Sequence, residues 1–389
     1  MINHRTLTSR PLVHFVTLAT LTVSLSLLVQ SSKVSAQTAL PEQIITVKKP
    51  GFLGADLETT FYKPPGDGPF PLVVINHGKA AGDPRFQGRY MNAGATRYFL
   101  QRGYVVVYPM RQGFSKSTGG YIGGGCNVES NGVVQAEDVK AVIDYFAALP
   151  YVDKQKIIIA GQSHGGLTTM AFGTLNYPGV QGLINFAGGL RQDTCAGWES
   201  VLARAFGSYG KSTKTPSLWF YGDNDSYWPK PVWESMFSQY EANAKANGAI
   251  TKMVAFGPFV VDAHSMFGHR QGFGIWQPEV GNFLQSLGMP YEVSYAQFGQ
   301  APLSVKPAAT IFAAINDIGA VPHLKDSGRK GYETFLTQPM PRAFALSPTG
   351  AWGSNQGLDD SHERALASCN RFSPGQPCKL YAVDDIVVW

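Results

Sequence analysis

Lys156-Ile157-Ile158-Ile159-Ala160-Gly161-Gln162-Ser163-His164-Gly165-Gly166-Leu167 joins an apolar strand pattern to a helical pattern through a turn in which glycines surround a serine. The continuous apolar run before the turn is typical of a strand that is buried on both faces. A Gly-x-Ser-x-Gly turn between a strand and a helix holds the serine Oγ above the edge of a sheet. The backbone N–H of the next residue, His164, then faces the place where an oxyanion would form. Ser163 is therefore the candidate nucleophile.

The alternation of strand and helix patterns continues on both sides of this turn. Segments that indicate buried strands lie at 72–76, 104–108, 183–187, 218–221 and 253–256. Helical patterns lie between and after them, at 86–102, 133–149, 167–175, 231–246 and 271–287. Apolar strands that alternate with helices predict an α/β fold built on a mostly parallel sheet. We expect this domain to span residues 37–290.

A different pattern follows this domain. Residues 291–307 are rich in Ser, Gln, Ala and Pro, which predicts a linker. Residues 308–389 predict a small α+β domain, with strand-like segments at 310–314, 342–346 and 379–389 and a helix at 359–368. This unit is either a structural cap or a module that binds substrate or cell wall, because a fold pattern alone does not assign a function.

The candidate acid follows the strand pattern at 218–221. A serine nucleophile needs a base, and the base needs an acid that orients it. The sequence Gly222-Asp223-Asn224-Asp225 lies where a strand reaches the carboxyl edge of the sheet, the usual place for such groups. Asp225 is the expected acid because the Gly-x-x-Asp turn resembles the acid loop of the α/β-hydrolase superfamily. Asp223 is the alternative acid or a residue that caps the turn.

The candidate base follows the last strand pattern. Asp262-Ala263-His264 comes after 253–256, so His264 completes the chain order serine, acid, histidine. His269 is a rival, but it stands at the start of a helical pattern and is expected at the surface. The side chain of His164 is expected to pack inside the nucleophile turn.

A second oxyanion donor is expected after the strand pattern at 72–76. The sequence there is Asn76-His77-Gly78-Lys79. Gly78 allows the chain to turn so that the backbone N–H of Lys79 faces the same point as that of His164. The side chain of Lys79 is expected in solvent.

These motifs resemble the α/β-hydrolase superfamily, and within it the branch of dienelactone-hydrolase-like enzymes and exported serine esterases and peptidases. The resemblance covers about residues 50–288 and rests on 76–78, 108–114, 161–166, 221–225 and 262–264. It implies a doubly wound, mostly parallel sheet of eight strands and a Ser163–Asp225–His264 triad. Dienelactone hydrolases use a cysteine nucleophile, so the serine at position 163 departs from their pattern.

The first 36 residues predict a secretory signal peptide. Basic Arg5 and Arg10 precede an apolar stretch at 12–29, and Val34-Ser35-Ala36 is a small-residue cleavage pattern. The alternative is an uncleaved membrane anchor, for which the stretch is short and contains polar residues. We therefore expect a secreted or periplasmic protein.

The charge of the chain indicates no polyanionic partner. Taking the three positive residues of the leader, Arg5, Arg10 and Lys33, from the net charge of +5 leaves +2. The rest of the chain has no cluster of Lys and Arg, which a nucleic-acid or membrane-surface role requires. We expect no nucleic-acid partner, and no membrane contact beyond the leader.

An exported chain with four cysteines favours disulfides. Cys369 and Cys378 flank a turn-rich stretch and are expected to pair, which leaves Cys126 to pair with Cys195; four cysteines allow three pairings in all. We expect no metal site, because the chain has no C-x-x-C or H-E-x-x-H motif.

Together these features predict a serine hydrolase that cleaves carboxylic esters through an acyl-enzyme and needs no cofactor. The alternatives are a serine peptidase for short peptides and a non-catalytic binding protein that keeps the fold. Four aromatic residues lie near the motifs and belong either to the substrate pocket or to the core: Tyr121, Trp198, Tyr227 and Trp228.

Overall fold

The computed structural model describes residues 1–2, 40–51, 54–80, 82–260, 262–299, 305–338, 340–356 and 361–389. Apart from its first two residues, the predicted signal peptide lies outside the described residues, and so does part of the predicted linker. None of the helices in the described ranges combines the length and the hydropathy that a membrane span requires.

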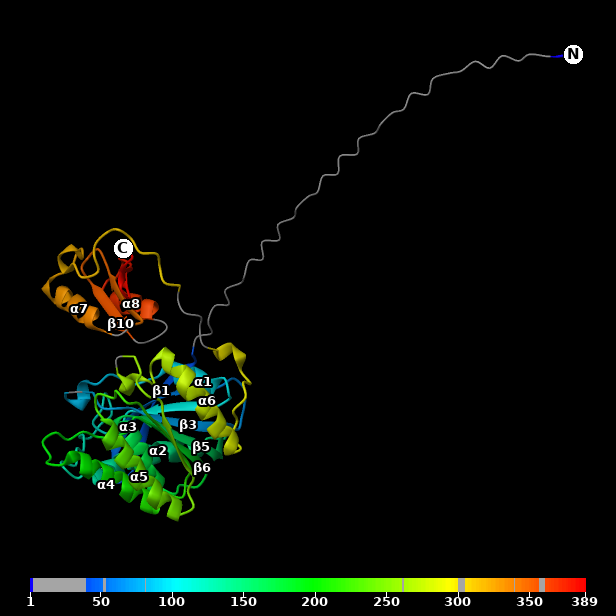
Figure 1. The fold of residues 1–389 in the computed structure, drawn as a ribbon. Coiled ribbons are helices and arrows are strands. Elements are labelled where there is room, and N and C mark those ends of the chain that lie inside the picture. Colours follow the sequence, from blue (N-terminus) through cyan, green and yellow to red (C-terminus); the bar gives the residue numbers. More distant parts are fainter. Residues whose placement is uncertain are drawn as a thin grey trace. The chain divides into compact units, whose positions relative to one another are not determined.

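Eight strands form the first sheet, in the order β1-β2-β4-β3-β5-β6-β7-β8 (Figure 1). Strands β3 to β8 run parallel, whereas β2 is antiparallel to both β1 and β4. The expected doubly wound, mostly parallel sheet of eight strands is therefore confirmed. The strands are β1 Glu42–Lys49, β2 Ala55–Tyr62, β3 Phe70–Asn76, β4 Val105–Pro109, β5 Val152–Gln162, β6 Val180–Phe186, β7 Ser217–Tyr221 and β8 Thr251–Ala255.

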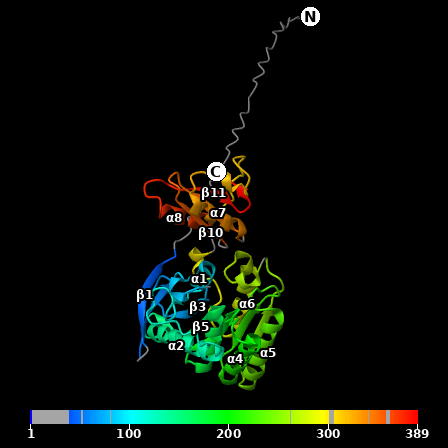
Figure 2. The ribbon, with the colours of Figure 1, turned by 90° about the vertical axis from the view of Figure 1, so that its left-hand side faces the viewer.

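Helices cover both faces of this sheet (Figures 1 and 2). Leu72 and Val74 of β3 pack in the core on one face, and Val73 and Ile75 pack in the core on the other. Each strand of a parallel sheet must be apolar on both faces for this reason. On the first face lie α2 Val128–Ala147, α3 His164–Phe172, α4 Trp198–Ser212 and α5 Lys230–Ala246; on the second lie α1 Ala93–Leu100 and α6 Arg270–Ser286.

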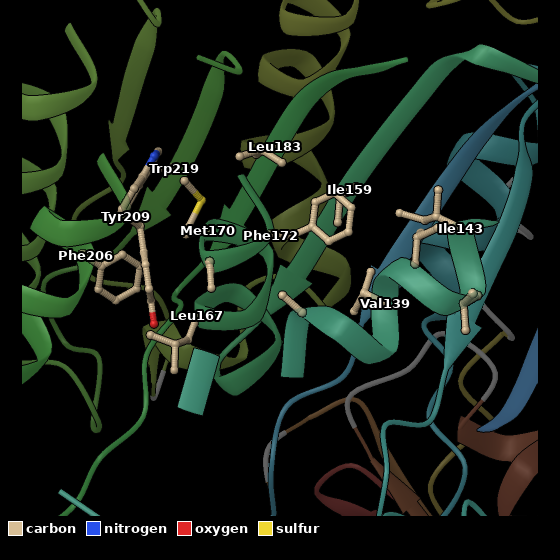
Figure 3. Packing of buried hydrophobic residues seen from close by; sticks show 14 of the residues in the cluster. Val139, Ile143, Ile159, Leu167, Met170, Phe172, Leu183, Phe206, Tyr209 and Trp219 are labelled. Carbon is tan, nitrogen blue, oxygen red and sulfur yellow. The ribbon is translucent and has the colours of Figure 1, made fainter. Parts of the chain in front are cut away.

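The core on the α2–α5 side holds both elements that flank the nucleophile turn (Figure 3). Ile159 of β5 and Met170 and Phe172 of α3 are at most 1% exposed. They share this core with Val139 of α2 and Trp219 of β7. Burial of one such side chain contributes about 1.5–3 kcal/mol. The turn between β5 and α3 is therefore anchored on both sides.

The C-terminal unit has its own antiparallel sheet, in the order β10-β9-β11-β12. Tyr332 and Phe335 of α7 pack against Phe344 on one face, while Ala365 of α8 packs against Ala343 on the other. The expected small α+β unit is confirmed. Its elements are α7 Asp326–Thr337, β9 Arg342–Leu346, β10 Trp352–Gln356, α8 Ser361–Asn370, β11 Lys379–Val383 and β12 Ile386–Val387.

Three segments differ from the sequence expectation. Residues 310–314 form no strand, and Ile311 is fully exposed, so this apolar run does not enter the sheet. The predicted final strand at 379–389 is divided at Asp384, whose φ of 53° turns the chain between β11 and β12. The predicted helix at 86–102 begins only at Ala93, because the side chain of Asn92 accepts a hydrogen bond from Ala95 N and caps α1.

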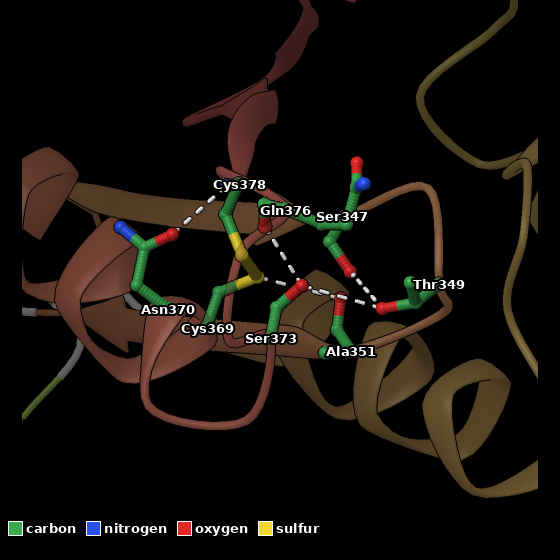
Figure 4. Close-up of a disulfide and its surroundings, with 8 residues drawn as sticks. All are labelled: Ser347, Thr349, Ala351, Cys369, Asn370, Ser373, Gln376 and Cys378. Atoms are coloured by element: carbon green, nitrogen blue, oxygen red, sulfur yellow. Dashed lines mark hydrogen bonds between the residues drawn. A yellow bond between two sulfur atoms is a disulfide. The ribbon is translucent and has the colours of Figure 1, made fainter.

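The four cysteines pair as expected. Cys126 and Cys195, with Cα atoms 5.7 Å apart, join the loop after β4 to the loop after β6. Cys369 of α8 joins Cys378, which directly precedes β11 (Figure 4). The N–H of Cys378 also donates to Asn370 Oδ1 at 2.9 Å, so the short disulfide loop is fixed at both ends.

Removal of the first disulfide is expected to destabilise the protein more than removal of the second. The cysteines are 69 residues apart in one and 9 in the other. Loop-closure entropy gives about 4 kcal/mol for the long loop and about 3 kcal/mol for the short one. Urea unfolding of Cys126→Ser/Cys195→Ser and of Cys369→Ser/Cys378→Ser checks the order. A larger loss for the second double variant would contradict it.

Candidate active site

Ser163 lies on a sharp turn between β5 and α3, where it is half-buried. Its φ of 55° and ψ of −125° are sparsely populated for a residue with a Cβ, at a cost of about 1–3 kcal/mol. Hydrogen bonds hold this backbone in place: Ser163 N donates to Phe186 O, and Ser163 O accepts from Gly166 N and Gly189 N. The strained turn is thus fixed by both α3 and the loop after β6.

Two glycines of the turn are required by close approach. A Cβ at Gly165 would overlap the backbone carbonyl of Asn76, at the end of β3. A Cβ at Gly161 would overlap the backbone of Gly165. The Gly-x-Ser-x-Gly spacing therefore reflects the packing of α3 directly onto the ends of β3 and β5.

Asp225 and His264 form a hydrogen-bonded pair. His264 Nδ1 lies 3.1 Å from Oδ2 and 3.2 Å from Oδ1 of Asp225. The carboxylate is fully buried, and its Oδ1 also accepts the backbone N–H groups of Tyr227 at 2.9 Å and Trp228 at 3.0 Å. Since a carboxylate only accepts, the proton of the neutral imidazole is on Nδ1. Nε2 is then free to take a proton.

The rival residues make other contacts. Asp223 is partly exposed and pairs with Lys230 at 3.0 Å. His269 is buried and not at the surface as expected, because its Nδ1 accepts from Gln271 N and so caps α6. His164 is buried beneath the turn, as expected. Of the candidate acids and bases, the structure brings Asp225 and His264 together.

Two contacts connect the nucleophile turn to its neighbours, one to His264 and one to the loop after β3. Gln162 Nε2 donates to the backbone carbonyl of His264 at 2.8 Å. A Cβ at Gly78 would lie 3.2 Å from the Cβ of Ser163, so the loop passes directly beside the nucleophile. Among the described residues, Ser163 Oγ and His264 Nε2 do not form a hydrogen bond; such bonds are often long before substrate binds.

A buried arginine bridges the two segments that carry the candidate oxyanion donors, His164 and Lys79. Arg111, which follows β4, donates from Nη2 to His77 O at 2.7 Å and to His164 Nδ1 at 3.2 Å. Its backbone N–H donates to His77 Nε2 at 3.0 Å. One guanidinium thus fixes both the residue after Ser163 and the loop that leads to Lys79. The Lys79 ammonium bonds to loop carbonyls near the surface.

The pKa values of Arg111, His77 and His164 show which of these three buried groups is charged. Burial lowers the pKa of Arg111 to about 10, so the group remains charged at neutral pH, and the Asp138 carboxylate favours that charge. Burial, together with the charge of Arg111, holds the pKa of both His77 and His164 well below the ordinary value. Neutral His164 accepts from Arg111 at Nδ1 and donates from Nε2 to Asn131 Oδ1 at 2.7 Å.

These two neutral histidines predict a loss of stability in acid. Below the unfolded-state pKa of 6.5 the unfolded chain binds protons at His77 and His164 that the folded chain does not. The free energy of unfolding then falls with decreasing pH, by up to about 1.4 kcal/mol per pH unit for each histidine. The variant His164→Gln keeps an amide donor and acceptor but does not titrate. Urea unfolding at pH 5 to 6 should give it the shallower pH slope, and equal slopes would contradict the assignment.

The four aromatic residues have different environments. Tyr227 is 45% exposed, and its ring centroid lies 4.4 Å from that of His264. Tyr121 and Trp198 are half-buried, and Tyr121 lies edge-on to His164. Trp228 is only 1% exposed, and its indole N–H donates to Ala187 O. Of the two alternatives, the core is the one that fits Trp228, and the other three residues present surface.

Residues beyond the sequence candidates also shape the site. Arg111, Asn131, Gln162 and Asp262 make the contacts that fix the turn and the loops. Arg111, Gln162 and Asp262 stood inside the motifs at 108–114, 161–166 and 262–264, but those motifs did not indicate these contacts. Asn131 stood in no motif, and its partner His164 is 33 residues away. No group of three or more His, Cys, Asp or Glu side chains is placed to hold a metal ion in the part of the chain that the structure describes.

A family model described as X-Pro dipeptidyl-peptidase (S15 family) matches residues 54–198. This segment includes Lys79, Arg111 and Ser163 but ends before Asp225 and His264. No curated protein matches the chain significantly.

Similar solved structures include an esterase, Pf2001, of Pyrococcus furiosus, at 15% identity and a TM-score of 0.46, with 64% of this chain and 90% of that chain covered. An acylaminoacyl peptidase of Pyrococcus horikoshii is 18% identical, with a TM-score of 0.49 and coverage of 67% and 44%. Dipeptidyl peptidase 4 of Porphyromonas gingivalis is 17% identical, with a TM-score of 0.48 and coverage of 64% and 36%.

Proposed function

We propose that this chain, an α/β-hydrolase by fold, is a serine hydrolase that cleaves carboxylic esters with Ser163, His264 and Asp225. One observation carries the proposal: the buried Asp225–His264 pair lies at the same sheet edge as the strained Ser163 turn. The side chain of Gln162, the residue before Ser163, donates a hydrogen bond to the backbone carbonyl of His264. Ser163, Asp225 and His264 follow three parallel strands, β5, β7 and β8, at their carboxyl ends.

The proposed reaction is acyl transfer in two steps. His264 Nε2 takes the Oγ proton as Ser163 attacks the carbonyl carbon, and Asp225 stabilises the imidazolium. The backbone N–H groups of His164 and Lys79 hold the oxyanion, each contributing about 3 kcal/mol. The imidazolium gives its proton to the leaving alcohol, and water then hydrolyses the acyl-enzyme by the same sequence. No step of this reaction requires a cofactor.

The second candidate function is cleavage of short peptides. The match to a dipeptidyl-peptidase family over residues 54–198 favours it. That match covers the part of the proposed site that carries Ser163 and ends before Asp225 and His264, so we keep the ester function as the first candidate. The same three residues would carry either reaction, since both proceed through an acyl-enzyme.

Rates on two substrate series separate the candidates. We expect kcat/KM on p-nitrophenyl esters of increasing acyl length to exceed that on p-nitroanilides of dipeptides and tripeptides. Ser163→Ala measured in parallel corrects for hydrolysis that does not involve the site. Faster turnover of an anilide than of every ester would establish the peptidase and reject the esterase.

We also propose that the enzyme works outside the cytoplasm, secreted or in the periplasm. Two disulfides fit an oxidising compartment. Detection of the mature protein, beginning at Gln37, in a periplasmic or culture fraction tests this. Recovery of full-length chain with reduced cysteines from the cytoplasm would contradict it.

A further inference from the structure

Hydrogen bonds join the loop that carries the acid, residues 222–228, to the loop that carries the base, the described residues from 256 to 264. The side chain of Asn224 pairs with both backbone groups of Phe259: Oδ1 accepts from Phe259 N at 2.8 Å, and Nδ2 donates to Phe259 O at 3.3 Å. These bonds align the first halves of the two loops.

Asp262 joins the second halves of the loops, next to the acid–base pair. Its Oδ1 accepts the backbone N–H groups of His264 at 2.9 Å and Ser226 at 3.1 Å. Its Oδ2 accepts the Ser226 hydroxyl at 2.7 Å. A single carboxylate therefore binds both the base residue and the residue that directly follows the acid.

We infer that Asp262 is a positioning residue that sets the geometry between Asp225 and His264. The inference rests on the proposed function, whereas the contacts from which it is argued are present whatever the function is. Ser226 lies between Asp225 and Tyr227, whose N–H binds the Asp225 carboxylate, so holding Ser226 fixes the direction of that carboxylate. Holding His264 N fixes the point from which the imidazole extends.

The contacts also exclude a role for Asp262 as the acid itself. The imidazole Nδ1 faces Asp225, and Asp262 contacts only the backbone of His264. Hydrogen bonds to a charged acceptor are stronger than those between neutral groups, and both loops depend on this one carboxylate. A displacement of about 1 Å at a reacting group is enough to cost about 10²-fold in rate.

A simple cap of the short helix Ala263–Ser265 would also use Asp262, and the variants distinguish that role from positioning. Asp262→Ala removes every bond. Asp262→Asn keeps an acceptor for both N–H groups and can donate to the Ser226 hydroxyl. Asp262→Ser keeps the cap on His264 N but does not reach Ser226, and it preserves the fold if the alanine variant does not.

Asp317→Ala is the matched control, because Asp317 caps the short helix Ile318–Ala320 of the C-terminal unit.

We expect kcat on the best ester to fall about 50-fold in Asp262→Ala and about 10-fold in Asp262→Ser, with KM changed less than threefold. Asp262→Asn should stay within about fivefold of the wild type, and Asp317→Ala should be unchanged. A kcat within threefold of the wild type in Asp262→Ala would overturn the inference. So would equal losses in the Asn and Ala variants, because the effect would then come from charge and not from position.

A proton resonance separates this inference from the proposed function. The Nδ1–H of His264 bonded to Asp225 should give a low-field signal that disappears in His264→Ala. We expect the signal to be retained in Asp262→Asn and lost or broadened in Asp262→Ala, whether or not an ester is turned over. Retention of an unchanged signal in Asp262→Ala would overturn the positioning role even in a protein that proved to be an active esterase.

Discussion

Replacement of His264 by alanine is expected to lower kcat by about 10⁶-fold, the size of the loss when a triad base is removed. Without the imidazole, nothing at the site takes the Oγ proton of Ser163 during attack. KM should change little, because the other residues around Ser163 remain in place. Steady-state kinetics on a p-nitrophenyl ester with concentrated variant protein measure the effect.

His269→Ala is the matched control for this experiment. His269 caps α6 through Gln271 N and is buried, so its loss should cost about 1 kcal/mol of stability and leave kcat within threefold. The assignment of the base would be wrong if His264→Ala remained active and His269→Ala lost its activity.

Asp225→Asn is expected to lower kcat about 10⁴-fold through the tautomer of His264. Oδ1 of Asp225 accepts two backbone N–H groups, from Tyr227 and Trp228. The amide oxygen of an asparagine must take that place, which turns the NH₂ group toward the imidazole. Nδ1 then becomes an acceptor and Nε2 carries the proton, so the base can no longer accept one from Ser163.

Asp223→Asn tests whether the effect is specific. This residue lies two positions earlier in the same loop, is partly exposed and pairs with Lys230. A surface ion pair contributes at most about 1 kcal/mol, and we expect a kcat within twofold of the wild type. Equal losses in the two variants would show that the loop, and not the Asp225–His264 bond, sustains catalysis.

The central sheet could be predicted from sequence because its strands are apolar on both faces. The runs that became β3 to β7 are apolar and largely buried, which is the pattern a parallel sheet between helices imposes. The run at 253–256 was also expected to be buried, but it belongs to the edge strand β8, whose residues are half-buried or exposed. β1 and β2 were not predicted: β1 is an edge strand with exposed residues, and its pairing with β2 is decided by packing.

The candidate site was predictable where it depends on local motifs. The turn around Ser163, the acid loop and the base loop each have a short sequence signature. Contacts between distant segments have none: Arg111 reaches His164, and Asp262 reaches Ser226, across many residues. The burial of Trp228 depends on the loop after β6 packing against it, which its position next to the acid loop did not indicate.

Labelling with a fluorophosphonate probe tests the central claim most directly. The account predicts one covalent adduct per wild-type chain, on the peptide that contains Ser163, and none in Ser163→Ala. The alanine variant keeps a Cβ and the same backbone strain, so its melting temperature should match the wild type and exclude misfolding as the cause. Equal labelling of the two proteins would show that Ser163 is not the nucleophile.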